Sequence, residues 1–170
     1  GYAHGAANSA SIYGFTSADA SIFNNTFNGN ASSPTGINEN TGSGWNVTGN
    51  NITNYSGQGI NYGATGANNR FYNNTISFTG NGIATSGTGG NFSFNTLLNN
   101  TDGISAFIGT ANFFNNNAIN GSTSYGILFG SFQNYFYGNT INGYPYFHCF
   151  NSSSWAAGNA SVAEPKMTNY

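Results

Sequence analysis

The side chains that could carry acid–base chemistry are few and widely separated in the sequence. General acid–base catalysis needs two groups that converge on one substrate, and no two acids of this chain hold the same position in its sequence repeat. The sequence therefore predicts that the protein has no catalytic residues and is not an enzyme. Charged residues make up 4% of the 170 residues, against about 25% in an ordinary domain; they are Asp19, Glu39, Arg70, Asp102, Glu164 and Lys166.

Cys149 is the single cysteine and follows His148 directly. One cysteine cannot form an internal disulfide, and with only His4 and His148 as further soft ligands it cannot complete a structural zinc site. The sequence therefore predicts no metal and no cofactor. The aromatic run of residues 144–150 favours a buried thiol, and the alternative is an intermolecular disulfide, which makes Cys149 a candidate for an inter-subunit contact.

The charge balance excludes several classes of partner. The formal net charge is −2, with one Arg and one Lys, so the chain lacks the basic surface that nucleic-acid binding requires. It also lacks an apolar run of about 18 residues, which a membrane-spanning helix would need. The chain starts at Gly1 without Met, and we expect a processed secreted protein or a fragment, located outside the cell or at its surface.

A sequence repeat must position any chemistry on this surface. Each copy has an apolar residue, an Asn three positions later and an apolar residue two positions after that, as in Ile22, Asn25 and Phe27. The last apolar positions are 27, 52, 76, 97, 119 and 141, a spacing that is typical of stacked coils. The asparagines of the six copies form the predicted structural ladder: Asn25, Asn50, Asn74, Asn95, Asn117 and Asn139.

A second signal lies between successive copies of the repeat. A Gly-Ile pair recurs five times, at 36–37, 59–60, 82–83, 103–104 and 126–127. Glycine permits a tight bend with positive φ, and Asn tolerates it next best. Each coil is therefore predicted to contain three short strands joined by bends with Asn and Gly at the corners. No stretch shows the three-and-four spacing of an amphipathic helix.

This pattern resembles the right-handed parallel β-helix repeat family, which includes pectate lyases, NosD-like proteins and many archaeal and bacterial surface proteins. The resemblance implies an all-β fold, a single right-handed parallel β-helix of about six coils. We expect one domain, 1–170, in which 1–17 is a degenerate coil or cap, 18–147 holds the repeats and 148–170 is a cap or a subunit-contact segment. Enzymes of this family place acids for Ca²⁺ and an Arg or Lys base on one face, and this chain lacks that arrangement.

The near absence of charge indicates a structural role. Equivalent residues of stacked coils lie about 4.8 Å apart, where like charges repel by roughly 1 kcal/mol even in water, whereas neutral amides hydrogen-bond to one another. Neither end of the repeat region has a charged cap of the kind that prevents end-to-end growth. We therefore expect a structural extracellular protein that self-assembles with copies of itself into an amyloid-like filament, sheath or surface layer.

The alternative is a glycan-binding or ice-binding module of a larger surface protein. Ice-binding solenoids generally have two parallel ranks of Thr. The position after the ladder Asn gives this chain a single partial rank: Thr26, Asn51, Thr75, Thr96, Ala118 and Thr140. Aromatic residues that could stack on sugars lie at different offsets from the repeat: Trp45, Tyr62, Tyr72, Tyr137 and Trp155.

Eleven Asn-X-Ser/Thr sequons occur in the chain. In an extracellular protein some of them would carry covalent N-glycans, and sequons in loops are better candidates than those inside the ladder copies. We expect glycosylation at Asn30, Asn91, Asn99 and Asn159.

Overall fold

The computed structural model describes residues 10–30, 32–106, 108–130, 133–142, 146–149, 155–157, 160–161 and 168–169. Of residues 15–17, and of those after 142, it describes the backbone alone. Every regular element in the described residues is a β-strand. The fold is therefore all-β, as predicted.

The strands form two sheets. The 13-stranded sheet contains β1 (Ala10–Ala18), β3 (Thr26–Asn28), β4 (Thr35–Ser43), β6 (Asn51–Tyr62), β8 (Thr75–Thr85), β10 (Thr96–Leu98), β11 (Asp102–Ala106), β13 (Ala118–Asn120), β14 (Tyr125–Phe129), β16 (Thr140–Asn142), β17 (Tyr146–Cys149), β19 (Ala160–Ser161) and β20 (Thr168–Asn169). The seven-stranded sheet contains β2 (Ser21–Phe23), β5 (Asn46–Thr48), β7 (Arg70–Tyr72), β9 (Asn91–Ser93), β12 (Phe113–Asn115), β15 (Tyr135–Tyr137) and β18 (Trp155–Ala157).

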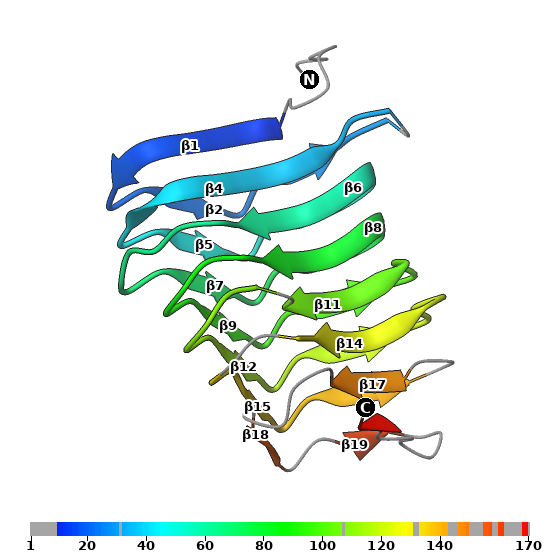
Figure 1. The fold of residues 1–170 in the computed structure, drawn as a ribbon. Coiled ribbons are helices and arrows are strands. Elements are labelled where there is room, and N and C mark those ends of the chain that lie inside the picture. Colours follow the sequence, from blue (N-terminus) through cyan, green and yellow to red (C-terminus); the bar gives the residue numbers. More distant parts are fainter. Residues whose placement is uncertain are drawn as a thin grey trace.

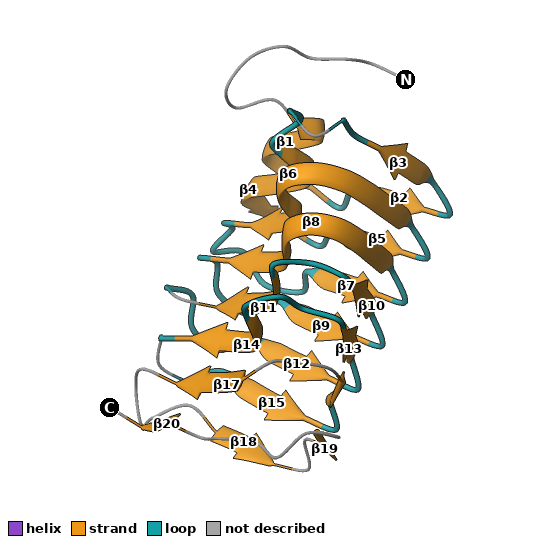
Figure 2. Ribbon diagram, turned by 90° about the vertical axis from the view of Figure 1, so that its right-hand side faces the viewer, coloured by secondary structure: helices purple, strands orange, loops and turns teal. Residues whose placement is uncertain are grey.

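Each strand pairs in parallel with the equivalent strand of the next coil, so the chain winds into a stack (Figures 1 and 2). The register follows the repeat, because Val47 pairs with Phe71 and Phe71 with Phe92. The Gly-Ile copies also align, since Ile60 pairs with Ile83. Their glycines, however, lie within strands, as Gly59 does in β6, and none of them has positive φ, so the prediction of a corner at the Gly-Ile pairs was wrong. β6 and β8 each continue through a bend without interruption, and their register shifts between Tyr55 and Gln58. These two coils therefore have a longer strand than the sequence predicted.

Three inward columns fill the core. The first residue of the repeat supplies a Phe column whose rings stack at centroid distances of 4.6 to 4.9 Å between Phe71, Phe92, Phe114 and Phe136. The second apolar position and the Gly-Ile position supply aliphatic columns, for example Ile76 and Ile83, which are both fully buried. Aromatic and aliphatic burial of this kind is the main stabilising contribution to the stack.

The corners are made by residues with left-handed backbone conformation, and successive corners lie five residues apart. The residue before each ladder Asn has positive φ, so the bend is next to the ladder residue and not at it. Asn and Gly hold most of these corners because they adopt this conformation at low cost. The three corner columns are Asp19, Gly44, Asn68, Gly89, Ala111 and Gln133; Asn24, Gly49, Asn73, Phe94, Asn116 and Gly138; and Asn54, Phe78, Asn99 and Gly121.

Phe78 is an unfavourable residue for its corner. Its φ is 53° and its side chain is 59% exposed, so little packing offsets the left-handed strain. We expect Phe78→Asn to raise the free energy of unfolding by about 1 kcal/mol, as measured by urea denaturation. The reciprocal change Asn99→Phe, at the same corner of the next coil, should lower it by a similar amount. A loss of stability in Phe78→Asn would contradict this account of the corner.

The described ends of the chain add strands to the stack. β1 pairs with β4, and β18, β19 and β20 pair with β15, β16 and β17. The sequence repeat is lost after residue 147, but β18, β19 and β20 still pair in parallel with the preceding coil. β1 lies at one end of the stack and β18 to β20 lie at the other (Figure 1).

Candidate functional site

The six asparagines of the repeat form a continuous hydrogen-bonded column through the stack. From Asn50 onward, the Oδ1 of each Asn accepts two bonds from the Asn of the preceding coil, as when Asn74 donates its backbone N–H and its Nδ2 to Asn95 Oδ1, both at 3.0 Å. From Asn50 onward, Nδ2 also donates to a carbonyl of the preceding coil, and Asn95 Nδ2 lies 3.0 Å from Phe71 O. Each of the four side chains from Asn50 to Asn117 therefore ties three coils together, because its Nδ2 also donates to the Asn of the next coil.

Sequence analysis missed a second set of buried asparagines. Asn69, Asn112 and Asn134 lie two residues before the Phe column, and Asn100 lies three residues after Leu97. Asn112 Oδ1 accepts from Gly90 N at 2.8 Å, and Asn100 Oδ1 accepts from Thr79 N at 3.0 Å. The sequence did contain a signal for this set, because Asn recurs two residues before the repeat Phe at positions 112 and 134.

Glu39 is the most unusual ionisable group that the structure describes. It is fully buried, and neither carboxylate oxygen has a hydrogen-bond partner among the described residues. It lies between Gly14 of β1 and Tyr62 of β6 in the register of the sheet. Burial raises the pKa of the Glu39 carboxyl to about 7, because the charged form is poorly solvated there.

Two of the aromatic residues expected to stack on sugars are not accessible. Trp45 is 2% exposed and Tyr62 is fully buried, so the prediction was wrong for both. Tyr62 O–H donates to Thr88 O at 2.6 Å. Burial raises the pKa of Tyr62 to about 12, with a smaller contribution in the same direction from Glu39, while the hydrogen bond from Asn69 lowers it. Trp155 has no described side chain.

The outer surface of the seven-stranded sheet carries a group of exposed aromatic residues. Two outward columns run along it, one through Asn46, Arg70, Asn91, Phe113 and Tyr135, and the other through Thr48, Tyr72, Ser93, Asn115 and Tyr137. Tyr72 and Tyr137 therefore share one column, contrary to the expectation of different offsets. We call this surface, with the neighbouring corner residue, the aromatic face: Arg70, Tyr72, Asn91, Ser93, Phe94, Phe113, Asn115, Tyr135 and Tyr137.

The aromatic face has two ring clusters. In the first, the Arg70 guanidinium lies 4.3 Å from the centroid of the Tyr72 ring, which in turn lies 5.3 Å from that of Phe94. In the second, the Phe113 and Tyr135 rings stack at 4.8 Å. Phe94 is 49% exposed and Phe113 is 44% exposed, so large apolar rings form part of the outer surface of this sheet.

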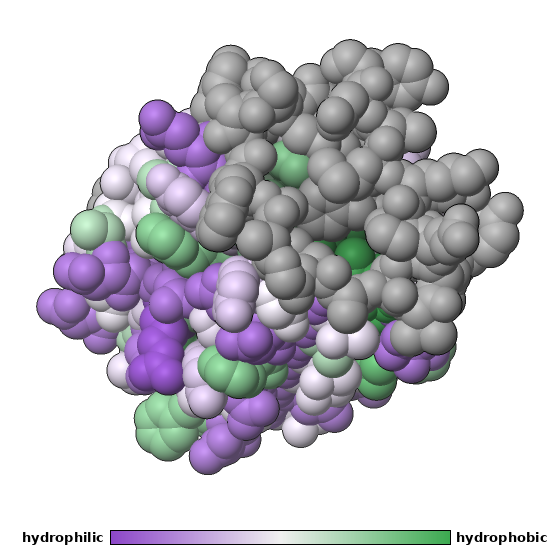
Figure 3. Space-filling model, turned by 90° about the horizontal axis from the view of Figure 1, so that it is seen from below, coloured by the Kyte–Doolittle hydropathy of each residue, from purple (hydrophilic) through white to green (hydrophobic). Residues whose placement is uncertain are grey.

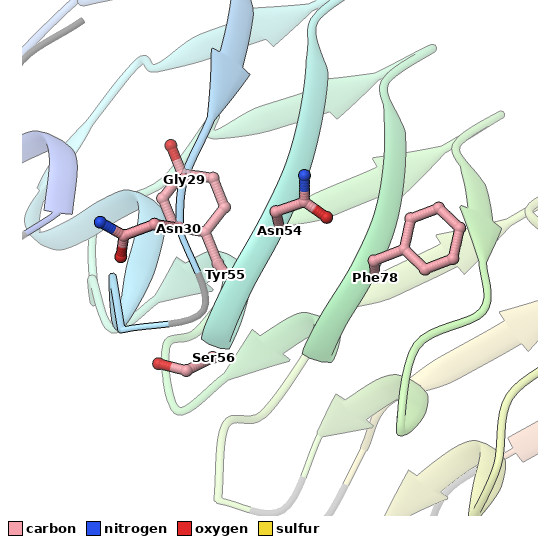
Figure 4. A pocket seen from close by; sticks show the side chains of 6 residues that line it. All are labelled: Gly29, Asn30, Asn54, Tyr55, Ser56 and Phe78. Atoms are coloured by element: carbon pink, nitrogen blue, oxygen red, sulfur yellow. The ribbon is translucent and has the colours of Figure 1, made fainter.

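An open cleft of about 360 Å³ lies at the third corner, lined by Gly29, Asn30, Asn54, Tyr55, Ser56 and Phe78 (Figure 4). Its side chains are amide, hydroxyl and aromatic groups. The Tyr55 hydroxyl is 2.6 Å from Ser11 Oγ. Burial raises the pKa of Tyr55, and the bond to Ser11 partly opposes this. The cleft thus presents no pair of groups suited to proton transfer.

Comparison with known proteins agrees with the geometry. A family model described as a right-handed β-helix region matches residues 4–143. The chain belongs to the right-handed β-helix family. The predicted fold class and resemblance are thereby confirmed. No curated protein and no solved structure matches the chain significantly. The family includes both enzymes and non-enzymes, so membership establishes the architecture of this β-helix and not an activity.

The carboxylates of this β-helix do not converge in the part of the chain that the structure describes. Glu39 points inward from β4, Asp102 accepts a hydrogen bond from Tyr125 N at 3.2 Å, and Asp19 holds a corner. No group of three or more His, Cys, Asp or Glu residues that could hold a metal ion occurs there. Nor do these residues include a helix long and apolar enough to cross a membrane.

The partial Thr rank lies on the outward side of the 13-stranded sheet, with Thr75 paired to Thr96. The parallel outward column of this β-helix contains a single Thr, so the second Thr rank typical of ice-binding solenoids does not form. Its members are Asn28, Thr53, Ser77, Leu98, Asn120 and Asn142.

The predicted modification and contact residues lie at several places on this β-helix. Asn30 and Asn99 are exposed and lie between strands, as expected, whereas Asn91 is exposed but begins strand β9 and does not lie in a loop. Asn159 lies outside the described residues. Cys149 pairs in register with Phe129 on one side and Asn169 on the other, and its side chain is not described. Glycosylation at these asparagines and a subunit contact through Cys149 therefore stay predictions.

Proposed function

We propose that this β-helix is a structural, non-enzymatic protein of the cell exterior that assembles end to end into a filament, sheath or surface layer. The observation that carries the proposal is the open edge of β1. This nine-residue strand pairs with β4, and none of the described strands covers its other edge. An open edge offers a row of unpaired backbone N–H and C=O groups to another chain.

β1 lacks the features with which proteins usually protect an edge strand. It contains no charged residue and no proline, both of which block pairing at an edge. Its first half keeps a regular register with β4, from Ala10 opposite Thr35 to Gly14 opposite Glu39, and the register shifts only around Phe15. The regular half is therefore a suitable template for a further parallel strand.

The ladder is also open at this end. Asn25 is exposed, and its Oδ1 accepts no hydrogen bond from the described residues, although its Nδ2 donates to Asn50 Oδ1 at 3.2 Å. A further coil above could donate to Asn25 as Asn25 donates to Asn50. An interface between two different ends of identical units yields an open fibre when the rotation between units does not close a ring, and stacking along the coil axis is such a case.

The surface of the β-helix supports close packing of identical units. Six charged residues leave little repulsion between copies. In the view from below, most of the described surface is hydrophilic or intermediate in hydropathy, with hydrophobic residues between (Figure 3). With so few charged residues in the chain, its polar side chains are mainly amides and hydroxyls. Such groups can form neutral ladders between units, as in cross-β assemblies.

The test places a charge at the proposed junction. Ile12 begins the inward Gly-Ile column, pairs with Ile37 and is only partly buried. In Ile12→Lys the ammonium group can remain solvated in a single unit, but a joined stack would bury it at a cost of several kcal/mol. We expect wild-type protein to form ordered filaments or sheets in electron microscopy, and Ile12→Lys to remain dispersed in sedimentation velocity.

A matched variant controls for the added charge. Tyr137→Lys places the same group on the outer face of β15, where the native side chain is 56% exposed, and it should still assemble. Circular dichroism would verify that both variants keep their β-structure. Dispersed wild-type monomers at high concentration, or unimpaired assembly of Ile12→Lys, would refute end-to-end growth through β1.

A second candidate function is glycan binding on the aromatic face. The stacked rings of Phe113 and Tyr135, together with Tyr72 and neighbouring amides, offer flat apolar surfaces beside hydrogen-bonding groups. Aromatic side chains of this kind suit ligands with one apolar and one polar side, such as sugars. An oligosaccharide array would test this function independently of assembly.

A further inference from the structure

The sequons and the buried asparagines of this β-helix are separate sets. Nine buried asparagines occur among the described residues, and none of them begins an Asn-X-Ser/Thr sequence. All nine sequon asparagines in the described part of the chain are exposed: Asn24, Asn30, Asn46, Asn51, Asn54, Asn73, Asn91, Asn99 and Asn120. The fold therefore keeps every described acceptor amide open to modification.

Among these residues, Asn91 has a distinctive position on the aromatic face. It lies on β9 between Arg70 and Phe113 in the outward column. The Arg70–Tyr72–Phe94 cluster lies on one side of it and the Phe113–Tyr135 stack lies on the other. We propose that Asn91 carries an N-linked glycan and that this glycan lies over the aromatic face.

The local geometry suits Asn91 as an acceptor. Ser93, the hydroxyl residue of the sequon, donates its Oγ–H to Asn91 Oδ1, and Asn91 Nδ2 makes no hydrogen bond to the described residues. Glycosylation would join Nδ2 to C1 of a sugar from a diphosphate-linked glycosyl donor. Nδ2 would lose one proton, and the lipid diphosphate would leave with the electron pair of the broken C1–O bond.

The spacing of the coils brings the rings within reach of such a glycan. Neighbouring strands lie about 4.8 Å apart, so Phe113 is about one strand spacing and Tyr135 about two from Asn91. The first few sugar rings would extend along the column and place their apolar C–H faces on these aromatic rings. The covering group is thus part of the molecule itself, which accounts for large apolar side chains that are exposed in the polypeptide alone.

Asn46 provides an internal comparison on the same sheet. It is an exposed sequon residue in the same column, and Thr48 Oγ1 donates to its Oδ1 at 2.7 Å. Its register neighbours, however, are Ser21 and Arg70, neither of which is aromatic. One exposed ring lies near Asn46, since Phe23 pairs with Thr48 and is 62% exposed. A glycan at Asn46 would therefore cover less apolar surface than one beside the Phe113–Tyr135 stack, and its removal should expose less.

The experiment uses the full chain secreted from a host with N-glycosylation. Peptide mapping after glycosidase treatment in ¹⁸O-labelled water would identify each occupied Asn by its conversion to labelled Asp. Binding of the dye ANS would report exposed apolar surface. We expect Asn91 to be occupied in the wild type, and Ser93→Ala to lose that glycan and show several-fold higher ANS fluorescence. Thr48→Ala, which removes the sequon at Asn46, should raise ANS fluorescence clearly less than Ser93→Ala, because Phe23 is the one exposed ring opposite Thr48.

Two results would overturn the proposal. The first is an unmodified Asn91 in the secreted wild type. If an added oligosaccharide then lowered ANS fluorescence, the face would bind a free glycan and not a covalent one. An occupied Asn91 whose removal leaves ANS binding unchanged would show that the glycan does not cover the face. Should Ser93→Ala fail to fold, glycosidase-treated wild-type protein gives the same comparison. Neither readout depends on end-to-end assembly, so the two proposals can fail separately.

Discussion

Replacing Asn95 by leucine is expected to lower the free energy of unfolding by about 4 kcal/mol. Leucine is similar in size but has no polar atom. The Asn74 N–H and Nδ2 would lose their shared acceptor, which is now 3.0 Å from each. Phe71 O would lose its 3.0 Å bond from Asn95 Nδ2. All of these groups are buried in the stack, and each buried group left unsatisfied costs about 1 to 3 kcal/mol.

Urea and thermal denaturation would measure this effect, and for a chain of this length we expect the Tm to fall by about 10 °C. Asn115→Leu is the matched control, because Asn115 lies on the outer face of β12, in register with Ser93 and Tyr137. It should change stability by less than about 0.5 kcal/mol. Equal effects of the two substitutions would show that the ladder has no special role in stability.

The stability of the β-helix should depend on pH through Glu39. The pKa of this carboxyl rises from 4.5 to about 7 in the folded protein, so the fold favours the neutral acid. Its contribution to stability is complete below pH 4.5, declines as pH rises through the interval up to 7, and stays constant above that. Glu39→Gln keeps a neutral side chain of the same shape at every pH. We expect its free energy of unfolding to exceed that of the wild type by about 2 kcal/mol at pH 8, because only the wild-type side chain is then charged inside the stack.

Denaturation at pH 4, 6 and 8 would test this expectation. Asp19→Asn is the control, because it removes one negative charge at an exposed corner whose left-handed conformation Asn tolerates well. It should retain the decline in stability between acid and alkaline pH that Glu39→Gln loses. Parallel pH profiles for wild type and Glu39→Gln would mean that Glu39 gains a partner or water in solution.

The architecture could be predicted because the repeat reports stacked positions directly. A residue that recurs at every coil, such as the ladder Asn or the Gly-Ile pair, has the same neighbours above and below, and its environment can be read from its column. This reasoning predicted the stacked coils and the Asn ladder. It failed where a column changes its residue type from coil to coil.

Trp45 illustrates that failure. It occupies the column in which other coils have Asn69, Gly90 and Asn112, so its burial was not apparent from the repeat. Glu39, Tyr62 and Thr85 share another variable column. Each of them lies two residues after the Ile of a Gly-Ile pair. Strand alternation from that inward Ile would have placed Glu39 and Tyr62 inside. The aromatic face was missed for a related reason, since outward columns are free to vary.

The short sequence distance between stacked partners has a consequence for how the chain folds. Ladder partners are separated by only 21 to 25 residues, and this separation stays nearly constant from one end to the other. The entropy lost in closing each coil is therefore about the same for the last coil as for the first. No coil has to wait for a distant segment, so a chain leaving the ribosome or a secretion channel could add one coil at a time, with each finished coil as the template for the next.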